Sequence, residues 1–387
     1  MYLESLSLRD WRNHPATDLV LGPGVHVLVG GNAQGKTNVL EAIAYLATQH
    51  SHRAPSPAPL VRMGAEAAVI RSVVRRGAQE RRVTLDMEVR ARGRRRIRVN
   101  GQAPSRSADA LGTIRVVSFA PEDLALVRGE PGDRRRFLDE LLAQRRPAYA
   151  AARAEFERTV RQRNHLLRQA RGSQRTPAAL EDWTAALIQH GATLLAARIA
   201  VVHALAAPLT EAYASLLPAG APSAALPTLI YDASTGAQVP ADPTAGVPDP
   251  AGLAAALQEA LYSRFSEERE RGLTLVGPHR DDVVLRIGQL PARGYASHGE
   301  CWSLALALRV ASHRVLTDFG EHGDEPLVLL DDVFAELDEG RRARLAARCA
   351  DFGQVLVTAA VERDVPLPGR TYEVSSGSVK VRGDARS

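Results

Sequence analysis

The sequence predicts an α/β fold, with a mixed sheet as the core of one part of the chain and a second, mostly helical domain. An apolar strand over Val25–Val29 passes directly through a glycine-rich segment into an amphipathic helix. Helical periodicity then continues almost unbroken between residues 121 and 217. Toward the end of the chain, helices alternate with short apolar strands, and the continuous run over 326–330 is typical of a buried parallel strand.

Composition sets the limits of the fold. The 387 residues are 45% hydrophobic and 24% charged, which is enough apolar content for two or three cores. The net charge of +5 suits a polyanionic partner such as nucleic acid, although an arginine-biased composition gives the same value. Cys301 and Cys349 lie in apolar helical patterns without metal-type spacing. We therefore expect two buried free thiols in a reducing cytosol.

No membrane segment or secretion signal is expected. The N-terminal residues alternate like a strand and lack the apolar core of a signal peptide. The most apolar long stretch, Ala185–Leu209, contains Arg198 and His203 and is too polar for a lipid-facing span. These features predict a cytoplasmic protein.

The N-terminal segment, residues 1–120, is predicted to be rich in strands. Asn100-Gly101 is a type I′ turn signal, so the arginine-rich run before it should lead into a hairpin with alternate arginines on one face. The expected strands are Leu3–Leu8, Val25–Val29, Ala68–Val74, Arg82–Val89 and Arg96–Val99.

Residues 121–270 form the expected helical domain. Its helical pattern breaks at 172–177, which predicts two antiparallel helices forming a short arm. Residues 218–252 are rich in Pro, Ala, Gly and Ser and predict a loop-dominated connector, with one strand-like island at Thr228–Tyr231. Residues 271–387 should return to the sheet domain, with strands at Leu273–Val276 and Val283–Ile287 and a final strand at Gln354–Thr358.

The glycine-rich segment matches the pattern of a phosphate-binding loop. Backbone N–H groups can close around phosphate oxygens, and the helix begins with its positive dipole end facing them. Lys36, one of only two lysines in the chain, would reach the outer phosphates, and the Thr37 hydroxyl can ligate Mg²⁺. The alternative is a strand-to-helix turn without a ligand. The predicted loop residues are Gly30, Gly31, Asn32, Ala33, Gln34, Gly35, Lys36 and Thr37.

Two carboxylates follow the apolar run at 326–330. Asp331 can hold Mg²⁺ through water, and Asp332 can orient and deprotonate an attacking water in line with the γ-phosphate. An Asp-rich turn at the end of a strand is the simpler alternative, but the phosphate-binding loop in the same chain favours the magnesium interpretation.

Ser297 and Glu300 fit a capping box at the start of a helix. This structural role does not require Gly299. An exposed helix start with the pattern Ser-x-Gly can also bind a terminal phosphate through its N–H groups, and the two roles are compatible.

The order of these motifs resembles the ABC-type ATPase heads of the SMC class. Five further segments resemble the signature segments of the RecF family of bacterial DNA replication and repair proteins, and the match spans nearly the whole chain. These segments are Phe119–Leu124, Gly129–Pro131, Arg134–Asp139, Gly277–Asp282 and Leu330–Asp338.

The resemblance implies an ATP-dependent DNA-binding protein that acts with RecR and RecO to place RecA on single-stranded gaps. Two heads would sandwich two ATP molecules, with slow hydrolysis as a switch. It implies that Gly30–Thr37 bind ATP, that Thr37 and Asp331 hold Mg²⁺, and that Lys36 and Asp332 act in catalysis.

The same resemblance implies further contacts. Ser297 and Gly299 would touch the γ-phosphate held by the opposite protomer, and Asp338 would lie at the dimer seam. Arg53 would reach ATP, as in SMC-type heads; a solvated loop arginine is the alternative. For DNA phosphates the candidates are the arginines of the predicted hairpin, or else these form a solvated face. They are Arg94, Arg95, Arg96 and Arg98.

Four alternative functions are a transporter subunit, a GTPase, a small-molecule kinase and a tethering SMC protein. A transporter subunit would carry a switch histidine where this chain has Thr358. A GTPase would need an N-K-x-D motif, which neither Lys36 nor Lys380 provides, and a small-molecule kinase would need a substrate lid. A tethering SMC protein would need long coiled-coil arms, whereas helices of about 35 residues reach only about 50 Å.

Overall fold

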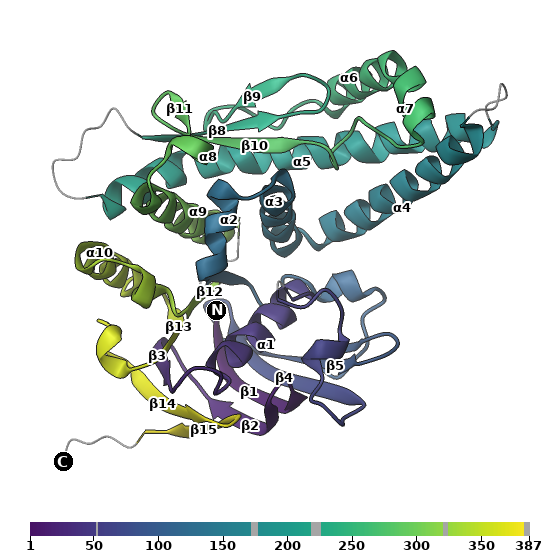
Figure 1. Cartoon of the computed structure of the whole chain (residues 1–387). Coiled ribbons are helices and arrows are strands. Elements are labelled where there is room, and N and C mark those ends of the chain that lie inside the picture. Colours follow the sequence, from purple (N-terminus) through teal and green to yellow (C-terminus); the bar gives the residue numbers. More distant parts are fainter. Residues whose placement is uncertain (52, 172–176, 218–225, 320–323, 383–387) are drawn as a thin grey trace. The chain divides into compact units, whose positions relative to one another are not determined.

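The computed structural model describes residues 1–51, 53–171, 177–217, 226–319 and 324–382. Two compact units divide the chain (Figure 1). The sheet unit comprises Met1–Asp123, Ala214–Ala221 and Leu306–Ser387, and the helical unit comprises Leu124–Tyr213 and Pro222–Ala305. The expected segment 271–387 is therefore shared between the units, with the division at Ala305/Leu306 inside a helix.

An antiparallel five-stranded sheet forms one layer of the sheet unit. In spatial order its strands are β2 (His14–Val20), β1 (Tyr2–Trp11), β4 (Ala67–Arg76), β5 (Arg81–Arg90) and β6 (Arg96–Val99). Strand β2 was not predicted. The type I′ turn after β6 is confirmed, because Asn100 and Gly101 have φ values of 51° and 77°.

A mixed six-stranded sheet forms the other layer, and it confirms the predicted α/β class. Five of its strands run parallel, and only the edge strand β15 pairs antiparallel. The spatial order is β15 (Ser378–Val381), β14 (Arg370–Ser375), β3 (Gly24–Val29), β13 (Gln354–Ala359), β12 (Leu327–Asp331) and β7 (Val116–Phe119).

Helix α1 (Lys36–Thr48) packs between the two sheets of this unit. Its buried side chains Val39, Ile43 and Leu46 share one apolar core with Leu6 of β1 and Leu356 of β13. Burial of this kind contributes roughly 1.5–3 kcal/mol per large apolar side chain, so the core fixes where α1 begins relative to the strand ends. Like α1, helix α10 (Glu339–Cys349) lies wholly within this unit.

The helical unit contains most of the remaining helices and a four-stranded antiparallel sheet (Figure 1). The helices are α2 (Leu124–Arg128), α3 (Pro131–Arg145), α4 (Pro147–Ala170), α5 (Ala179–Leu216), α6 (Pro250–Ser263), α7 (Phe265–Arg271), α8 (Ala292–Tyr295) and α9 (His298–Phe319). Helices α5 and α9 extend into residues of the sheet unit. The strand order is β11 (Leu290–Pro291), β10 (Asp282–Ile287), β8 (Pro227–Asp232) and β9 (Gln238–Pro240).

Buried ion pairs hold the helical unit together. The Arg198 guanidinium of α5 donates to both carboxylate oxygens of Asp139 over 2.9 and 3.0 Å. Arg163 of α4 donates to Glu268 of α7 over 2.6 Å, and both side chains are buried. Because Arg163 also reaches Thr184 of α5 over 3.0 Å, α4 is joined to two helices rather than only to its predicted antiparallel partner.

The strand predicted at Thr228–Tyr231 is confirmed, whereas two other strand predictions were wrong. This strand, β8, pairs with β10 along its whole length and with β9 at residues 230–232. Residues 273–276 form no strand, since Thr274 and Leu275 bond instead to the side chains of Asn164 and Glu268. The strand at 354–359 is not the last one, because β14 and β15 follow it.

Helix α5 is the one described helix that is long and apolar enough to cross a membrane by length and composition alone. Its most apolar 18-residue window is 61% buried inside the protein. Arg198 of this helix forms a buried ion pair with Asp139 of α3, so α5 has the contacts of a core helix.

Candidate nucleotide site

The predicted phosphate-binding loop lies where three parallel strands of the mixed sheet end. Strand β3 leads into the loop, β13 lies beside β3, and β12 lies beside β13. The register places Thr358 of β13 opposite Leu28 on one side and opposite Asp331 on the other. The carboxyl ends of parallel strands are the usual location of ligand sites in α/β folds.

Two loop glycines are required by close packing. A Cβ atom at Gly30 would lie 2.2 Å from the Val374 carbonyl oxygen, which is far inside contact distance. Gly35, at the N-cap of α1, has a φ of 111°, and a Cβ there would lie 2.6 Å from Asn13 Oδ1. The Lys36 ammonium donates to the Gly30 carbonyl over 2.7 Å and to the Gly31 carbonyl over 3.1 Å.

The structure brings Thr37, Asp331 and Asp332 together through Thr358. The Thr37 hydroxyl donates to Asp331 Oδ1 over 2.8 Å, and the Thr358 hydroxyl donates to the same oxygen over 2.7 Å. Thr358 also accepts the Asp332 N–H over 2.9 Å. Burial raises the pKa of Asp331, and the hydrogen bonds from Thr358 and Thr37 act in the opposite direction.

Thr358 belongs to the site. The sequence had singled it out only as the position where a transporter subunit would carry a histidine. Its hydroxyl bridges the side chain of Asp331 and the backbone of Asp332, which has a left-handed φ of 50°. The signal available in the sequence was its position near the end of a fully buried strand, next to the strand that carries the two carboxylates.

The turn between β14 and β15 supports the loop through hydrogen bonds to Gln34. The Ser376 N–H donates to Gln34 Oε1 over 2.6 Å, and the Gly377 N–H donates to the Gln34 carbonyl over 3.0 Å. The Asn13 side chain donates to that same carbonyl over 3.0 Å. These hydrogen bonds to Gln34 were not predicted from the sequence. The Ser376-Gly377 pair between alternating apolar residues is a hairpin signal that could have revealed the β14–β15 turn.

Arg53 and Asp338 both have structural partners. The Arg53 guanidinium donates to Asn38 Oδ1 over 3.0 Å and lies 3.6 Å from the Glu41 carboxylate. The Asp338 side chain caps α10 by accepting the Arg341 N–H over 2.9 Å, and its side chain remains 53% exposed. Each contact leaves part of the charged group accessible.

Ser297 and Gly299 belong to the helical unit, at the start of α9. The capping box is confirmed there, because the Ser297 N–H donates to Glu300 Oε2 over 2.8 Å and the Glu300 N–H donates to Ser297 Oγ over 3.3 Å. Ser297 is exposed.

The hairpin arginines differ in their surroundings. Arg95 donates through its two terminal nitrogens to the backbone and side-chain oxygens of Gln49, the C-cap residue of α1. Arg96 and Arg98 share the exposed face of β6, as predicted, with buried Ile97 between them. They lie opposite acidic residues, Glu88 and Asp86, on β5. Arg94 is exposed in the preceding loop.

The residues at the strand ends fit a magnesium ion of the phosphate-loop type. Thr37 and Asp331 offer a hydroxyl and a carboxylate, which are the hard oxygen ligands that Mg²⁺ prefers, and their oxygens lie 2.8 Å apart. No group of three or more His, Cys, Asp or Glu side chains suited to a metal occurs among the described residues.

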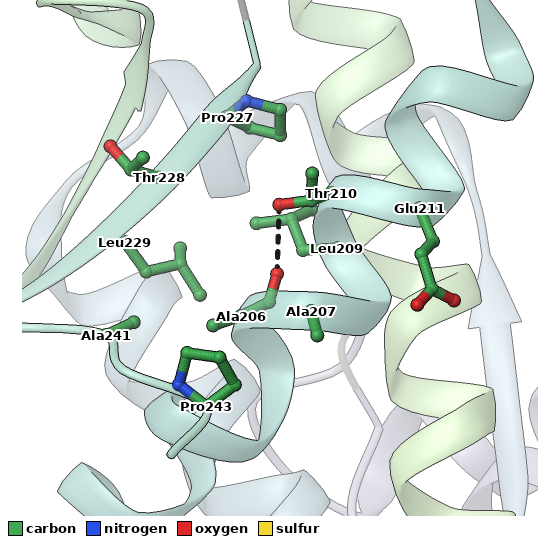
Figure 2. A pocket seen from close by; sticks show the side chains of 10 residues that line it. All are labelled: Ala206, Ala207, Leu209, Thr210, Glu211, Pro227, Thr228, Leu229, Ala241 and Pro243. Atoms are coloured by element: carbon green, nitrogen blue, oxygen red, sulfur yellow. Dashed lines mark hydrogen bonds between the residues drawn. The ribbon is translucent and has the colours of Figure 1, made fainter. Parts of the chain in front are cut away.

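A cavity of about 340 Å³ lies in the helical unit, between α5 and the strand β8 (Figure 2). Its wall is mostly apolar, with Leu209, Leu229 and Pro243 among the lining residues, and Glu211 is its one charged residue. None of the predicted site residues lines it.

Comparison with known proteins identifies the family. A family model described as the RecF/RecN/SMC N terminal domain matches residues 2–379. The DNA replication and repair protein RecF of Streptomyces avermitilis is 47% identical over 98% of this chain and 100% of its own length. This chain belongs to the RecF family. RecF of Frankia alni is 49% identical over 98% of this chain and 99% of its own length.

Solved structures agree with this membership. The RecF-ATP structure of the recombination mediator protein RecF in the RecFOR pathway has a TM-score of 0.88 at 26% identity, covering 99% of this chain and 98% of that one. The RecF-ATPrS structure has a TM-score of 0.87 at 26% identity, covering 98% of both chains. An Smc head, at 16% identity over 99% of this chain and 97% of its own, has a TM-score of 0.55 and shows the shared head fold. The predicted RecF resemblance and ABC-type head are confirmed.

Proposed function

We propose that this RecF family member binds ATP and Mg²⁺ at the loop Gly30–Thr37. The observation that carries the proposal is the bond from Thr37 to Asp331, which joins the first turn of α1 to the end of the neighbouring strand β12. A phosphate-loop hydroxyl beside a strand-end carboxylate is the magnesium-binding arrangement of P-loop nucleotide hydrolases. The solved RecF-ATP structure, which matches this chain over nearly its full length, supports ATP as the nucleotide.

Each residue then has a distinct role. Lys36 places a positive charge at the outer phosphates, while Thr37 and Asp331 would hold the metal ion. When bound, Mg²⁺ would neutralise charge on the transferred phosphate. Asp332 would orient and deprotonate the attacking water, and Thr358 holds the backbone N–H of Asp332 in place. Asp332 places its carboxylate one methylene shorter than the glutamate usual in two-acid ABC sites, which suits slow hydrolysis used as a switch.

The complete site would be composite. Ser297 and Gly299 of a second protomer would contact the γ-phosphate through the N-terminal N–H groups of α9, and Asp338 would lie at the seam. The capping box supports this role because it orders the start of the helix while Ser297 stays exposed. ATP would thus act as the link between two identical heads.

The bound polyanion would be DNA, at duplexes and at single-strand gaps. Exposed Arg94, together with Arg96 and Arg98 on one face of β6, supplies cations that neutralise phosphates without reading sequence. The RecFOR pathway named for the solved RecF structures supports RecR and RecO as partners and RecA loading as the outcome. A cytoplasmic location follows from DNA repair and agrees with the buried thiols Cys301 and Cys349.

Family membership leaves the transporter and kinase alternatives without support. The structure gives Thr358 hydrogen bonds to both strand-end aspartates, so the position of a transporter's switch histidine already has a different use here.

The test is the mass of the protein in solution by light scattering on a sizing column, with ATP and Mg²⁺, with and without gapped DNA. Wild type should dimerise only with ATP, Asp332→Asn should trap the dimer, and Lys36→Ala should stay monomeric. DNA should elute with the dimer alone. A wild-type monomer under all conditions would refute the composite site.

A further inference from the structure

Arg53 is held beside the nucleotide loop by two side chains of α1. Its guanidinium donates to Asn38 Oδ1 over 3.0 Å and lies 3.6 Å from Glu41. Asn38 directly follows Thr37, the predicted magnesium ligand.

Glu41 binds its two arginines unequally. The carboxylate is almost fully buried and takes a two-point contact from Arg12, over 2.8 and 2.5 Å, plus a hydrogen bond from Ser51 over 2.5 Å. Burial alone would raise the pKa of Glu41, but Arg12 and Ser51 outweigh it and the pKa is lowered. Glu41 therefore stays neutralised without Arg53, which avoids the large cost of a buried unpaired charge.

Of the two arginines beside Glu41, Arg53 is the one that can move to another partner. At 3.6 Å it makes no hydrogen bond to Glu41, and its side chain is 37% exposed, against 17% for Arg12. Among the described residues, Asn38 Oδ1 is the only acceptor of a hydrogen bond from the Arg53 guanidinium. Arg53 can thus leave Glu41 for a phosphate oxygen while Arg12 stays in place.

A relay of amides fixes the direction in which Asn38 points. The Asn38 amide donates to Asn13 Oδ1 over 2.8 Å, and the Asn13 amide donates to the Gln34 carbonyl of the nucleotide loop over 3.0 Å. Because the Asn38 nitrogen is used for Asn13, its oxygen is left to accept from Arg53. The position of Arg53 is therefore tied to the conformation of the loop.

We propose that Asn38 and Glu41 are positioning residues, which hold Arg53 ready as a mobile cation for the outer phosphates of the nucleotide. The inference rests on the proposed ATP site. If Glu41 and Arg12 formed a purely structural pair, neither Arg53 nor the amide relay would be needed. A substitution at Asn38 would then leave ATP affinity unchanged, whereas the proposed positioning role requires it to fall.

The test is the affinity of the full-length protein for a fluorescent ATP analogue with Mg²⁺, in a double-mutant cycle. Arg53→Ala should weaken binding about tenfold, the size expected for one lost charge-assisted hydrogen bond. Asn38→Ala should weaken it about threefold to tenfold. The double variant should bind like Arg53→Ala alone, because Asn38 acts through Arg53. Effects that multiply, or an Asn38→Ala variant that binds like wild type, would overturn the inference.

Three controls separate the possible failures. Thr48→Ala removes a hydroxyl that bonds to Ala44 at the far end of α1, and it should leave the affinity unchanged. Lys36→Ala should abolish binding; if it binds normally, the proposed ATP site itself is refuted. If Lys36→Ala fails to bind while Arg53→Ala binds like wild type, the site stands and the positioning inference is refuted.

Glu41→Gln gives a second cycle with Arg53→Ala. It keeps the acceptor oxygen but removes the charge, and its effect on ATP affinity should also disappear in the Arg53→Ala background. Glu41→Gln that weakens binding equally in both backgrounds would contradict a role through Arg53.

Discussion

The hydroxyl of Thr37 donates to Asp331 Oδ1 over 2.8 Å, although 294 positions separate the two residues in the sequence. The contact arises because α1 is clamped between two sheets, so that its first turn meets the end of β12. The same carboxylate oxygen accepts from Thr358, which places three elements of the sheet unit around one atom.

Thr358→Val should damage the site without changing its shape. The substitution keeps the volume of the side chain but removes a donor to Asp331 and an acceptor for the Asp332 N–H. We expect a loss of about 1–3 kcal/mol in unfolding free energy, because buried groups lose partners, together with slower ATP hydrolysis. Urea unfolding and steady-state hydrolysis would measure the two effects. Unchanged hydrolysis in a folded variant would mean that Thr358 does not position Asp332.

The arginines near β6 should separate into two classes. Arg94→Ala should weaken DNA binding and reduce the slope of log affinity against log salt by about 0.9, as expected for one lost phosphate contact. Arg95→Ala should leave that slope unchanged but destabilise the protein, since Arg95 holds Gln49 at the end of α1. Fluorescence anisotropy over a salt series distinguishes them. Equal loss of slope in both variants would contradict this division.

The buried pair in the helical unit should be essential for stability. Arg198→Met leaves the Asp139 carboxylate buried without its main cation, and breaking such pairs typically costs about 3–5 kcal/mol. Adding Asp139→Leu should recover part of that loss, because the uncompensated charge is removed. Urea unfolding of the two variants provides the measurement. A single variant as stable as wild type would show that the pair is dispensable.

His313 should make the protein sensitive to acid. Burial lowers the pKa of His313 from 6.5 to about 4, so the folded state disfavours its protonation. The resulting stability is fully present above pH 6.5 and is lost as pH falls toward about 4, amounting to up to about 3 kcal/mol. His313→Phe should flatten the dependence of unfolding free energy on pH in this window. The exposed His165→Gln is the control, and an equally steep profile in His313→Phe would exclude this histidine as the source.

Local patterns in the sequence were enough to predict the head. The strand, loop and helix around Lys36 depend on nearest neighbours, and so does the apolar run that ends at Asp331. The capping box of Ser297 and Glu300 and the type I′ turn at Asn100 are likewise local, and the structure contains both.

The features that were missed depend on contacts far apart in the chain. The turn at Ser376 bonds to Gln34 across 342 positions, and Arg163 meets Glu268 across 105. The periodicity of a short stretch of sequence gives no information about partners so far apart in the chain. The strand around Thr228 was predicted, but its pairing with β10 is again a contact between segments far apart in the chain.

In the proposed dimer, each ATP site combines the loop of one protomer with Ser297 and Gly299 of the other. The most direct measurement is ATP hydrolysis by a mixture of two inactive variants, Lys36→Ala and Ser297→Arg. A mixed dimer contains one site with an intact loop from one protomer and an intact α9 start from the other. We expect the mixture to regain part of the wild-type activity. Activity no greater than the sum of the two variants alone would contradict it.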